Sequence, residues 1–233
     1  MDSPVIIQSR NCKICDVNHN MSVLDTTIEK QVRAFFGSYP EREAVRHETV
    51  IHPGEHVSHV LYIETGVITQ FTITDSGNKL AMNTYKPGAF LPMMYVLEDR
   101  QNDYYFEVTS KNAKFKVAPA AEVVQFLRNN PEVTLDLLKR IYRGLDGLLK
   151  RMTDQMAGTA EDRVRTELLI MAERFGSKES DGKVSFEVTE QMIANHTGMA
   201  RETVSRVLPN VITQGSGIRR KGRKFSVDME LLQ

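Results

Sequence analysis

The sequence predicts an α+β protein with an N-terminal antiparallel, jelly-roll-like β-barrel, a long dimerisation helix and a C-terminal winged helix-turn-helix. Three observations predict it: strand-like runs alternate with turn residues between positions 45 and 119, an apolar heptad follows Pro131, and a helix-turn-helix pattern precedes a basic hairpin. We expect domain boundaries at 1–130 for the N-terminal segment and barrel, 131–157 for the long helix, and 158–233 for the winged helix-turn-helix.

Composition indicates a globular chain. Apolar residues make up 41% and charged residues 26% of the sequence, the ordinary balance for a protein that buries a core. No run approaches the ~20 apolar residues that span a bilayer, and the N-terminus lacks the basic flank and apolar core of a signal peptide. We therefore expect a cytoplasmic protein without a membrane partner.

The first 130 residues carry the barrel signals. Residues 1–20 are polar and irregular, and Leu24 to Phe36 have the apolar spacing of a short helix. From Val45 to Pro119, short β-prone runs are separated by turn residues at roughly ten-residue intervals, which predicts a small antiparallel barrel. The turn signals are Pro53-Gly54, Thr65-Gly66, Asp75-Ser76-Gly77-Asn78 and Pro87-Gly88.

Helical signals follow Pro119. Ala120 to Arg128 predict a short helix, and Pro131 is a favoured first residue for a longer one. Its apolar residues recur at intervals of three and four, so two copies could pair as a coiled coil in a homodimer. The alternative is a helix that packs this stripe on its own barrel. The stripe consists of Leu138, Ile141, Leu145, Leu148 and Met152.

The segment from Thr189 to Leu208 has the pattern of a helix-turn-helix. Ala194 is small where two helices cross closely, and Gly198, four residues later, suits a turn with positive φ. Val204 and Val207 then face the core from the second helix. Glu161 to Phe175 predict the first helix of this domain.

The opposite face of the second helix is polar, as in a helix that binds the major groove. Arginine can donate two hydrogen bonds to guanine, glutamate can accept one from cytosine, and serine can do either. Ile218 to Val227 predict a hairpin with its turn near Gly222, whose basic residues suit the phosphate backbone. The alternative is a solvated surface helix. The expected DNA-binding residues are Thr189, Arg201, Glu202, Thr203, Ser205, Arg206, Arg219, Lys221, Arg223 and Lys224.

Charge distribution favours the same surface. The formal net charge is zero, yet between Met199 and Phe225 seven Lys and Arg residues accompany one acid, Glu202. This end of the molecule should therefore attract phosphate while the remainder repels it.

In its helix-turn-helix and barrel segments, the chain resembles the CRP/FNR family of bacterial transcription regulators. The hexapeptide Arg201–Arg206 is similar to the family's recognition-helix signature, and Pro53-Gly54-Glu55 with Leu61–Ile68 is similar to its cyclic-nucleotide-binding-type barrel. The resemblance implies a homodimeric regulator, not an enzyme, that binds an inverted repeat in double-stranded DNA with half-sites such as TGTGA or TTGAT. RNA polymerase is a candidate further partner.

Two departures concern the output domain. Pro209 follows Leu208 where family members continue the helix, and we expect it to end or kink that helix. The stretch from Gly215 to Ile218 is one residue longer than usual, which leaves the orientation of the wing open.

The sensor lacks the family's nucleotide-binding residues. The Gly-Glu pair is replaced by Pro92-Met93 and the Arg-Ser pair by Tyr104-Tyr105, so the cation for the cyclic phosphate is missing. We expect no binding of cyclic AMP or cyclic GMP, and the effector stays unknown. Two alternatives remain, an apolar effector pocket or a barrel filled by its own side chains. The pocket candidates are Phe90, Met93, Met94, Tyr104 and Tyr105.

Cys12 and Cys15 are similar to the N-terminal cysteines of the FNR branch, in which four thiolates hold an iron-sulfur cluster. This chain has two cysteines, so the complete four-cysteine site is absent within one chain. A site shared across the dimer, a metal site with His19, a redox-active pair and inert thiols are the alternatives.

A histidine cluster raises a rival hypothesis, a metal-binding cupin-like enzyme fused to a DNA-binding domain. His56 and His59 are three residues apart and would face opposite sides of a strand, whereas cupin ligands share one face. We therefore expect no metal site at His47, His52, His56 and His59.

Overall fold

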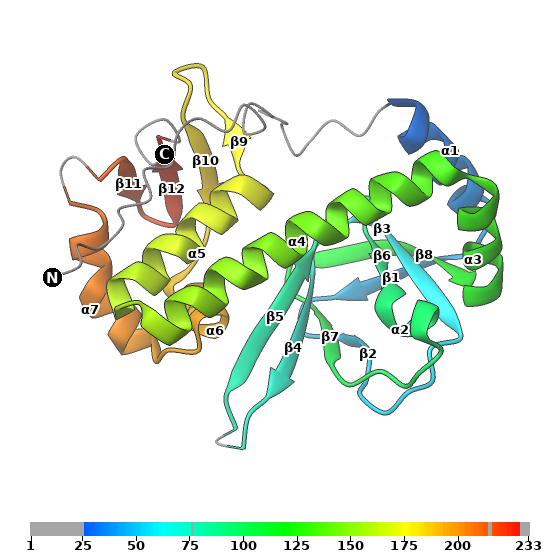
Figure 1. Ribbon diagram of the computed structural model, residues 1–233, viewed down its shortest axis with the longest axis horizontal. Coiled ribbons are helices and arrows are strands. Elements are labelled where there is room, and N and C mark those ends of the chain that lie inside the picture. The colour runs from blue at the N-terminus through cyan, green and yellow to red at the C-terminus, as the bar shows by residue number, and fades with distance from the viewer. Residues whose placement is uncertain (1–25, 76, 214–215, 229–233) are drawn as a thin grey trace, which may run out of the picture.

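The computed structural model describes residues 26–75, 77–213 and 216–228, in two lobes joined by the 27-residue helix α4 (Pro131–Ala157) (Figure 1). Cys12, Cys15 and His19 lie outside the described residues. None of the described helices has the length and apolar character needed to cross a membrane.

The N-terminal lobe is the predicted antiparallel barrel of two facing four-stranded sheets. One has the order β1-β8-β3-β6 and the other β2-β7-β4-β5. Ile63, Leu91, Phe106 and Phe115 are fully buried between them. The strands are β1 (Glu41–Val45), β2 (Thr49–Ile51), β3 (His59–Thr65), β4 (Ile68–Ile73), β5 (Lys79–Tyr85), β6 (Phe90–Leu91), β7 (Tyr105–Val108) and β8 (Asn112–Pro119).

The barrel begins four residues earlier than the apolar pattern indicates. In β1, whose sequence is Glu-Arg-Glu-Ala-Val, only Ala44 is buried, because this strand lies at a sheet edge and pairs only with β8. The predicted turns are confirmed, since Gly54, Gly66, Gly77 and Gly88 all have positive φ. At Gly66 a Cβ would collide with the backbone of Asn112 and Ala113 at the start of β8, so glycine is required there.

Three helices close the side of the barrel nearest the start of α4: α1 (Thr26–Gly37), α2 (Met93–Glu98) and α3 (Ala120–Asn129). Phe36 is fully buried and stacks on Tyr62 of β3 at 4.7 Å between ring centroids. Phe35 stacks on Phe126 of α3 at 4.1 Å. Val133 of α4 is buried in the same cluster, so the first turn of the long helix is anchored to the barrel. The sequence did not predict α2.

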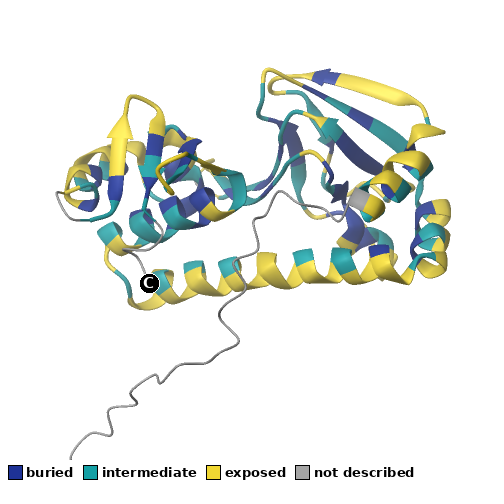
Figure 2. Ribbon diagram, turned by 90° about the horizontal axis from the view of Figure 1, so that it is seen from above, coloured by how far each residue is buried: buried dark blue, intermediate teal, exposed yellow. Residues whose placement is uncertain are grey.

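The heptad stripe of α4 is exposed along its length (Figure 2). Its five apolar side chains are between 44% and 55% accessible, so the barrel of the same chain does not cover them. Arg140, on another face, donates to the Gly88 carbonyl oxygen at 2.8 Å and fixes the rotation of the helix against the barrel. Among the residues that the structure describes, the apolar stripe therefore has no covering partner.

The C-terminal lobe packs three helices on a four-stranded sheet of order β11-β12-β10-β9. Thr159 caps α5, since its hydroxyl accepts from the Asp162 amide and the Asp162 carboxylate accepts from the Thr159 amide. Leu168, Ile193, Leu208 and Phe225 form the centre of the core. The elements are α5 (Ala160–Phe175), β9 (Ser177–Lys178), β10 (Val184–Glu187), α6 (Glu190–Thr197), α7 (Arg201–Val211), β11 (Ile218–Lys221) and β12 (Lys224–Val227).

The expectation is that Pro209 ends or kinks α7, and the first of these two outcomes is wrong. The helix runs to Val211, and the Ile212 amide still donates to the Leu208 carbonyl oxygen at 3.1 Å. Because Pro209 lies in the last turn, it removes one amide donor, that to Ser205, and leaves the later bonds intact. Val211 is fully buried, and its packing favours the extra turn.

The two lobes meet where the β4–β5 hairpin touches α5 and α6. Arg174 of α5 donates to the Asn83 side-chain oxygen at 2.6 Å and to the Thr84 carbonyl oxygen at 2.9 Å. The ammonium of Lys86 donates to the Arg174 carbonyl oxygen. These three partly buried contacts tie the C-terminal lobe to the barrel.

A buried ionic cluster lies beside them and includes α4. Glu167 of α5, with a side chain 1% exposed, pairs with Arg151 of α4 at 2.7 Å. Nδ1 of His196 from α6 lies 3.3 Å from Glu167, and Nε2 lies 3.4 Å from the Thr84 hydroxyl. Burial lowers the pKa of His196 below its ordinary value of 6.5, and Arg151 and Arg174 lower it further against the opposing effect of Glu167.

Candidate nucleic-acid interface

The helix pair α6–α7 has helix-turn-helix geometry. Thr189 caps α6 by accepting from the Met192 amide at 3.2 Å. Gly198 ends that helix with φ +68°, as predicted, and the Met199 amide donates back to the Ala194 carbonyl oxygen at 3.2 Å. Ala194 is buried at the crossing. The turn therefore fixes where α7 begins.

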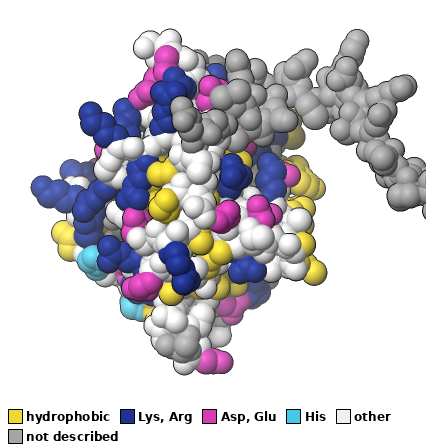
Figure 3. Space-filling model, turned by 90° about the vertical axis from the view of Figure 1, so that its left-hand side faces the viewer, with side chains coloured by type: hydrophobic (Ala, Val, Ile, Leu, Met, Phe, Trp, Pro, Cys, Tyr) yellow, Lys and Arg dark blue, Asp and Glu magenta, His cyan; other side chains and the backbone are white. Residues whose placement is uncertain are grey.

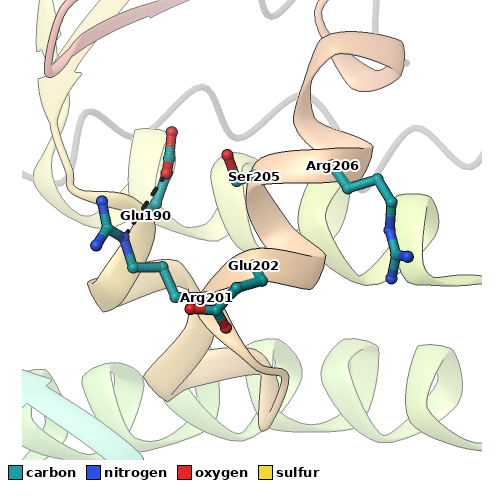
Figure 4. A pocket seen from close by; sticks show the side chains of 5 residues that line it. All are labelled: Glu190, Arg201, Glu202, Ser205 and Arg206. Carbon is teal, nitrogen blue, oxygen red and sulfur yellow. Dashed lines mark ion pairs between the residues drawn. The ribbon is translucent and has the colours of Figure 1, made fainter.

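One face of α7 is buried and the other is open. Val204 and Leu208 lie in the core, while Arg201, Glu202, Ser205 and Arg206 are exposed. The four polar residues and Glu190 line a shallow hollow, in which Arg201 points toward Glu190 and Arg206 extends away from both (Figure 4). Thr203 is half-buried, between the two faces.

The hairpin β11–β12 adds cations to this end of the molecule, and its turn lies at Gly222 with φ +63°. Arg219, Lys221 and Arg223 are exposed, and within the described residues their side chains have no ion pair or hydrogen bond. The ammonium of Lys224 is paired with Glu179 at 2.7 Å. Figure 3, which shows this end, has many Lys and Arg side chains with acids among them.

Sequence reasoning missed two residues of this surface. Glu190, the first residue of α6, accepts from Arg220 of β11 at 2.9 Å, and its other oxygen lies 3.9 Å from Nε of Arg201. An acid in the first turn of a helix is common for reasons of the helix dipole alone. The sequence therefore carried no signal that this one contacts the wing.

The five candidate pocket residues do not come together. Phe90 and Met93 are buried in the cluster between barrel and helices, whereas Tyr104 packs against the barrel interior. Tyr105 stacks on Phe71 at 5.1 Å between ring centroids, and Met94 is exposed. The five candidates therefore face different sides of β6, α2 and β7, and their role in binding an effector stays a prediction.

The four histidines also stay apart. His47 contacts Glu107 at 3.2 Å, His59 contacts Ser58 at 2.9 Å, and His56 lies 3.8 Å from Asp99. All four rings lie in exposed residues. In the part of the chain that the structure describes, no three His, Cys, Asp or Glu side chains form a group that could hold a metal ion. The cupin hypothesis requires such a group, and the described residues do not supply one.

Comparisons with known proteins agree with this architecture. The family model of the cyclic nucleotide-binding domain matches residues 41–130, and that of the Crp-like helix-turn-helix domain matches residues 162–233. The global nitrogen regulator of a Nostoc species is 25% identical over 170 residues, which cover 70% of this chain and 74% of that protein.

Solved structures share the fold. A CooA variant from Carboxydothermus hydrogenoformans superposes with a TM-score of 0.72 at 15% identity, over 91% of this chain and 97% of that one. A CRP/FNR-family regulator from Thermus thermophilus gives 0.60 at 20% identity, over 83% and 96%. With both family models in the same order as the two lobes, the chain belongs to the CRP/FNR family of DNA-binding transcription regulators.

Proposed function

We propose that the protein acts as a homodimer that binds inverted-repeat duplex DNA, with α7 of each protomer in the major groove and the wing on the adjacent backbone. The observation that carries this proposal is the outer face of α7. Four groove-compatible polar side chains are exposed there over a buried apolar face. They lie next to three wing cations that have no ion pair or hydrogen bond with any described residue.

The residues of this surface divide into two roles. Arg201, Glu202, Ser205 and Arg206 offer donors and acceptors suited to base edges. Arg219, Lys221 and Arg223 offer charge to phosphates, which adds affinity without sequence preference. We assign no base contact to Thr189, because its hydroxyl already accepts a hydrogen bond as the cap of α6. We propose instead that this half-buried residue lies against a phosphate.

The homodimer is proposed from α4. Five apolar side chains in a heptad spacing are exposed on one stripe, and exposed apolar patches of this kind mark interaction surfaces. A second copy offers the same stripe and thereby buries both. The proposed division is the barrel with its N-terminal segment to residue 130, the dimerisation helix at 131–157 and the DNA-binding domain from 158.

We further propose that cyclic AMP is not the effector and that the protein regulates transcription without catalysis, in the cytoplasm, with RNA polymerase as a candidate partner. The positions matching the family's phosphate-binding pair are Tyr104 and Tyr105, and neither can neutralise a phosphate. Tyr104 instead packs against the barrel core, which supports a sensor with another ligand or none.

The test is a selection of random duplexes by the purified protein, followed by sequencing. The proposal expects an inverted repeat whose half-sites are centred about one helical turn apart, since two α7 helices related by a two-fold axis must reach the same side of the duplex. Recovery of direct repeats, single half-sites or no preferred sequence would overturn it.

A further inference from the structure

The carboxylate of Glu190 lies between the recognition helix and the wing. One oxygen accepts from Nη1 of Arg220 at 2.9 Å, and the other lies 3.9 Å from Nε of Arg201. The Glu190 side chain is 17% exposed and that of Arg201 is 62% exposed. A single acid therefore contacts both α7 and the wing, and Figure 4 shows its contact with Arg201 of α7.

Arg220 is held from three sides. Besides Glu190, its Nε donates to the Gly222 carbonyl oxygen at 2.8 Å, and its guanidinium lies 5.4 Å from the centre of the Phe225 ring. Phe225 is buried in the domain core. Arg220 thus differs from its neighbours Arg219 and Lys221, because it braces the hairpin against α6 and is not a free phosphate ligand.

The contact with Arg201 is looser and more exposed. At 3.9 Å it is an ion pair without a hydrogen bond, so a better partner can replace it. While no base edge is in reach, Glu190 biases Arg201 toward the wing side of α7. When Arg201 moves away, the Glu190 carboxylate keeps only Arg220 as its partner, and its negative charge then repels a phosphate that approaches this surface.

We propose that Glu190 is a specificity-determining positioning residue. It fixes the wing through Arg220, orients Arg201, and its charge disfavours DNA that offers phosphates but no base partner for Arg201. This inference rests on the proposed function. Glu190 lowers affinity for random DNA more than for the selected site, and so widens the ratio between them.

The experiment compares Glu190→Gln with Glu173→Gln, which removes the same charge from an exposed position of α5 whose carboxylate acts on Lys150 of α4. Affinities for the selected duplex and for a random duplex are measured by fluorescence anisotropy at several salt concentrations. Glu190→Gln is expected to bind random DNA about fivefold more tightly or better, the effect of one nearby charge in a mostly aqueous setting. Its affinity for the selected duplex should change less, so the specificity ratio falls.

The control should keep the wild-type ratio. Equal changes on both duplexes for Glu190→Gln, or a ratio no lower than that of Glu173→Gln, overturn the inference. If the wild-type protein bound the selected and random duplexes equally, the proposed function itself would be wrong. The failure of the inference and the failure of the proposed function are therefore distinguishable.

A second variant tests the connection to the wing. Arg220→Gln removes the ion pair with Glu190 by changing the arginine instead of the acid, and the specificity ratio is expected to fall. Adding Glu190→Gln to Arg220→Gln should then lower the ratio by less than it does alone, because the shared contact is already gone. Strictly additive effects would contradict positioning through Arg220. Thermal midpoints of all variants show whether each is folded.

Discussion

At the scale of single residues, we expect substitutions on α7 to reduce sequence preference and substitutions on the wing to reduce affinity for all DNA. Arg206→Ala should weaken binding to the selected duplex by about 1–3 kcal/mol and relax preference at one base pair, because a forked donor to a base edge is lost. Arg223→Ala is the matched comparison, since it also removes one exposed arginine that has no ion pair among the described residues. It should weaken all sequences alike and flatten the salt dependence. Anisotropy titrations check both; equal losses for Arg206→Ala on selected and random DNA would refute its base contact.

A second prediction at the residue scale concerns the barrel, in which tyrosines replace the residues that bind the cyclic phosphate in the family. Tyr104 and Tyr105 stand where the family has its Arg-Ser pair, and Tyr105 is engaged with Phe71. A buried phosphate without a cation is unfavourable. Isothermal calorimetry of protein competent for DNA binding should therefore show no saturable heat with cyclic AMP or cyclic GMP at micromolar concentrations. Saturable binding of either nucleotide would show that other groups supply the missing charge.

At the scale of elements, α4 determines assembly. Leu145→Lys places an ammonium in the middle of the exposed stripe, where pairing would have to bury it. We expect monomers by sedimentation velocity and weaker binding to the inverted repeat, because the two half-sites are no longer linked.

Asp146→Lys is the control for this change. It introduces the same side chain at the next position, off the stripe, and disrupts only the exposed pair with Lys150, which is worth less than ~1 kcal/mol. This variant should remain dimeric. If Leu145→Lys sedimented with the same mass as the wild-type dimer, the stripe would not be the dimer interface.

At the scale of the whole molecule, the lobes are joined by buried polar groups. The link from α4 to α5 is short, and Arg163 spans it by donating to the Asp154 and Gln155 carbonyl oxygens at 3.2 and 3.1 Å. Arg151, Glu167 and His196 then connect α4, α5 and α6 next to the β4–β5 hairpin. The barrel and the helix-turn-helix are therefore connected through these contacts as well as through the chain between α4 and α5.

This junction predicts a pH dependence. The pKa of His196 is lowered in the folded protein by burial, so between that value and about 6.5 the unfolded chain binds more protons. Stability contributed by neutral His196 is present above about pH 6.5 and is lost as the pH falls below it. Thermal midpoints of wild type should drop more on acidification than those of His196→Gln. Parallel curves would show that His196 keeps its ordinary pKa.

The sequence by itself determined the features that depend on neighbours along the chain. The turns at Gly66 and Gly198, the helix that begins at Pro131 and the polar face of α7 follow from φ preferences and side-chain periodicity, which act over a few residues. The resemblance at Arg201–Arg206 predicted the family for the same reason, since its signature is contiguous.

Only the tertiary structure decided which distant groups meet. Glu190 and Arg220 are 30 positions apart, and Thr84 and His196 are 112 apart. No periodicity along the chain encodes such pairs, because each depends on how whole elements pack. Packing likewise explains why α7 continues beyond Pro209 to Val211. It also places Phe90 and Tyr104 in different apolar clusters. Local chemistry specifies what each element is, and the burial of its faces against other elements specifies which side chains become neighbours.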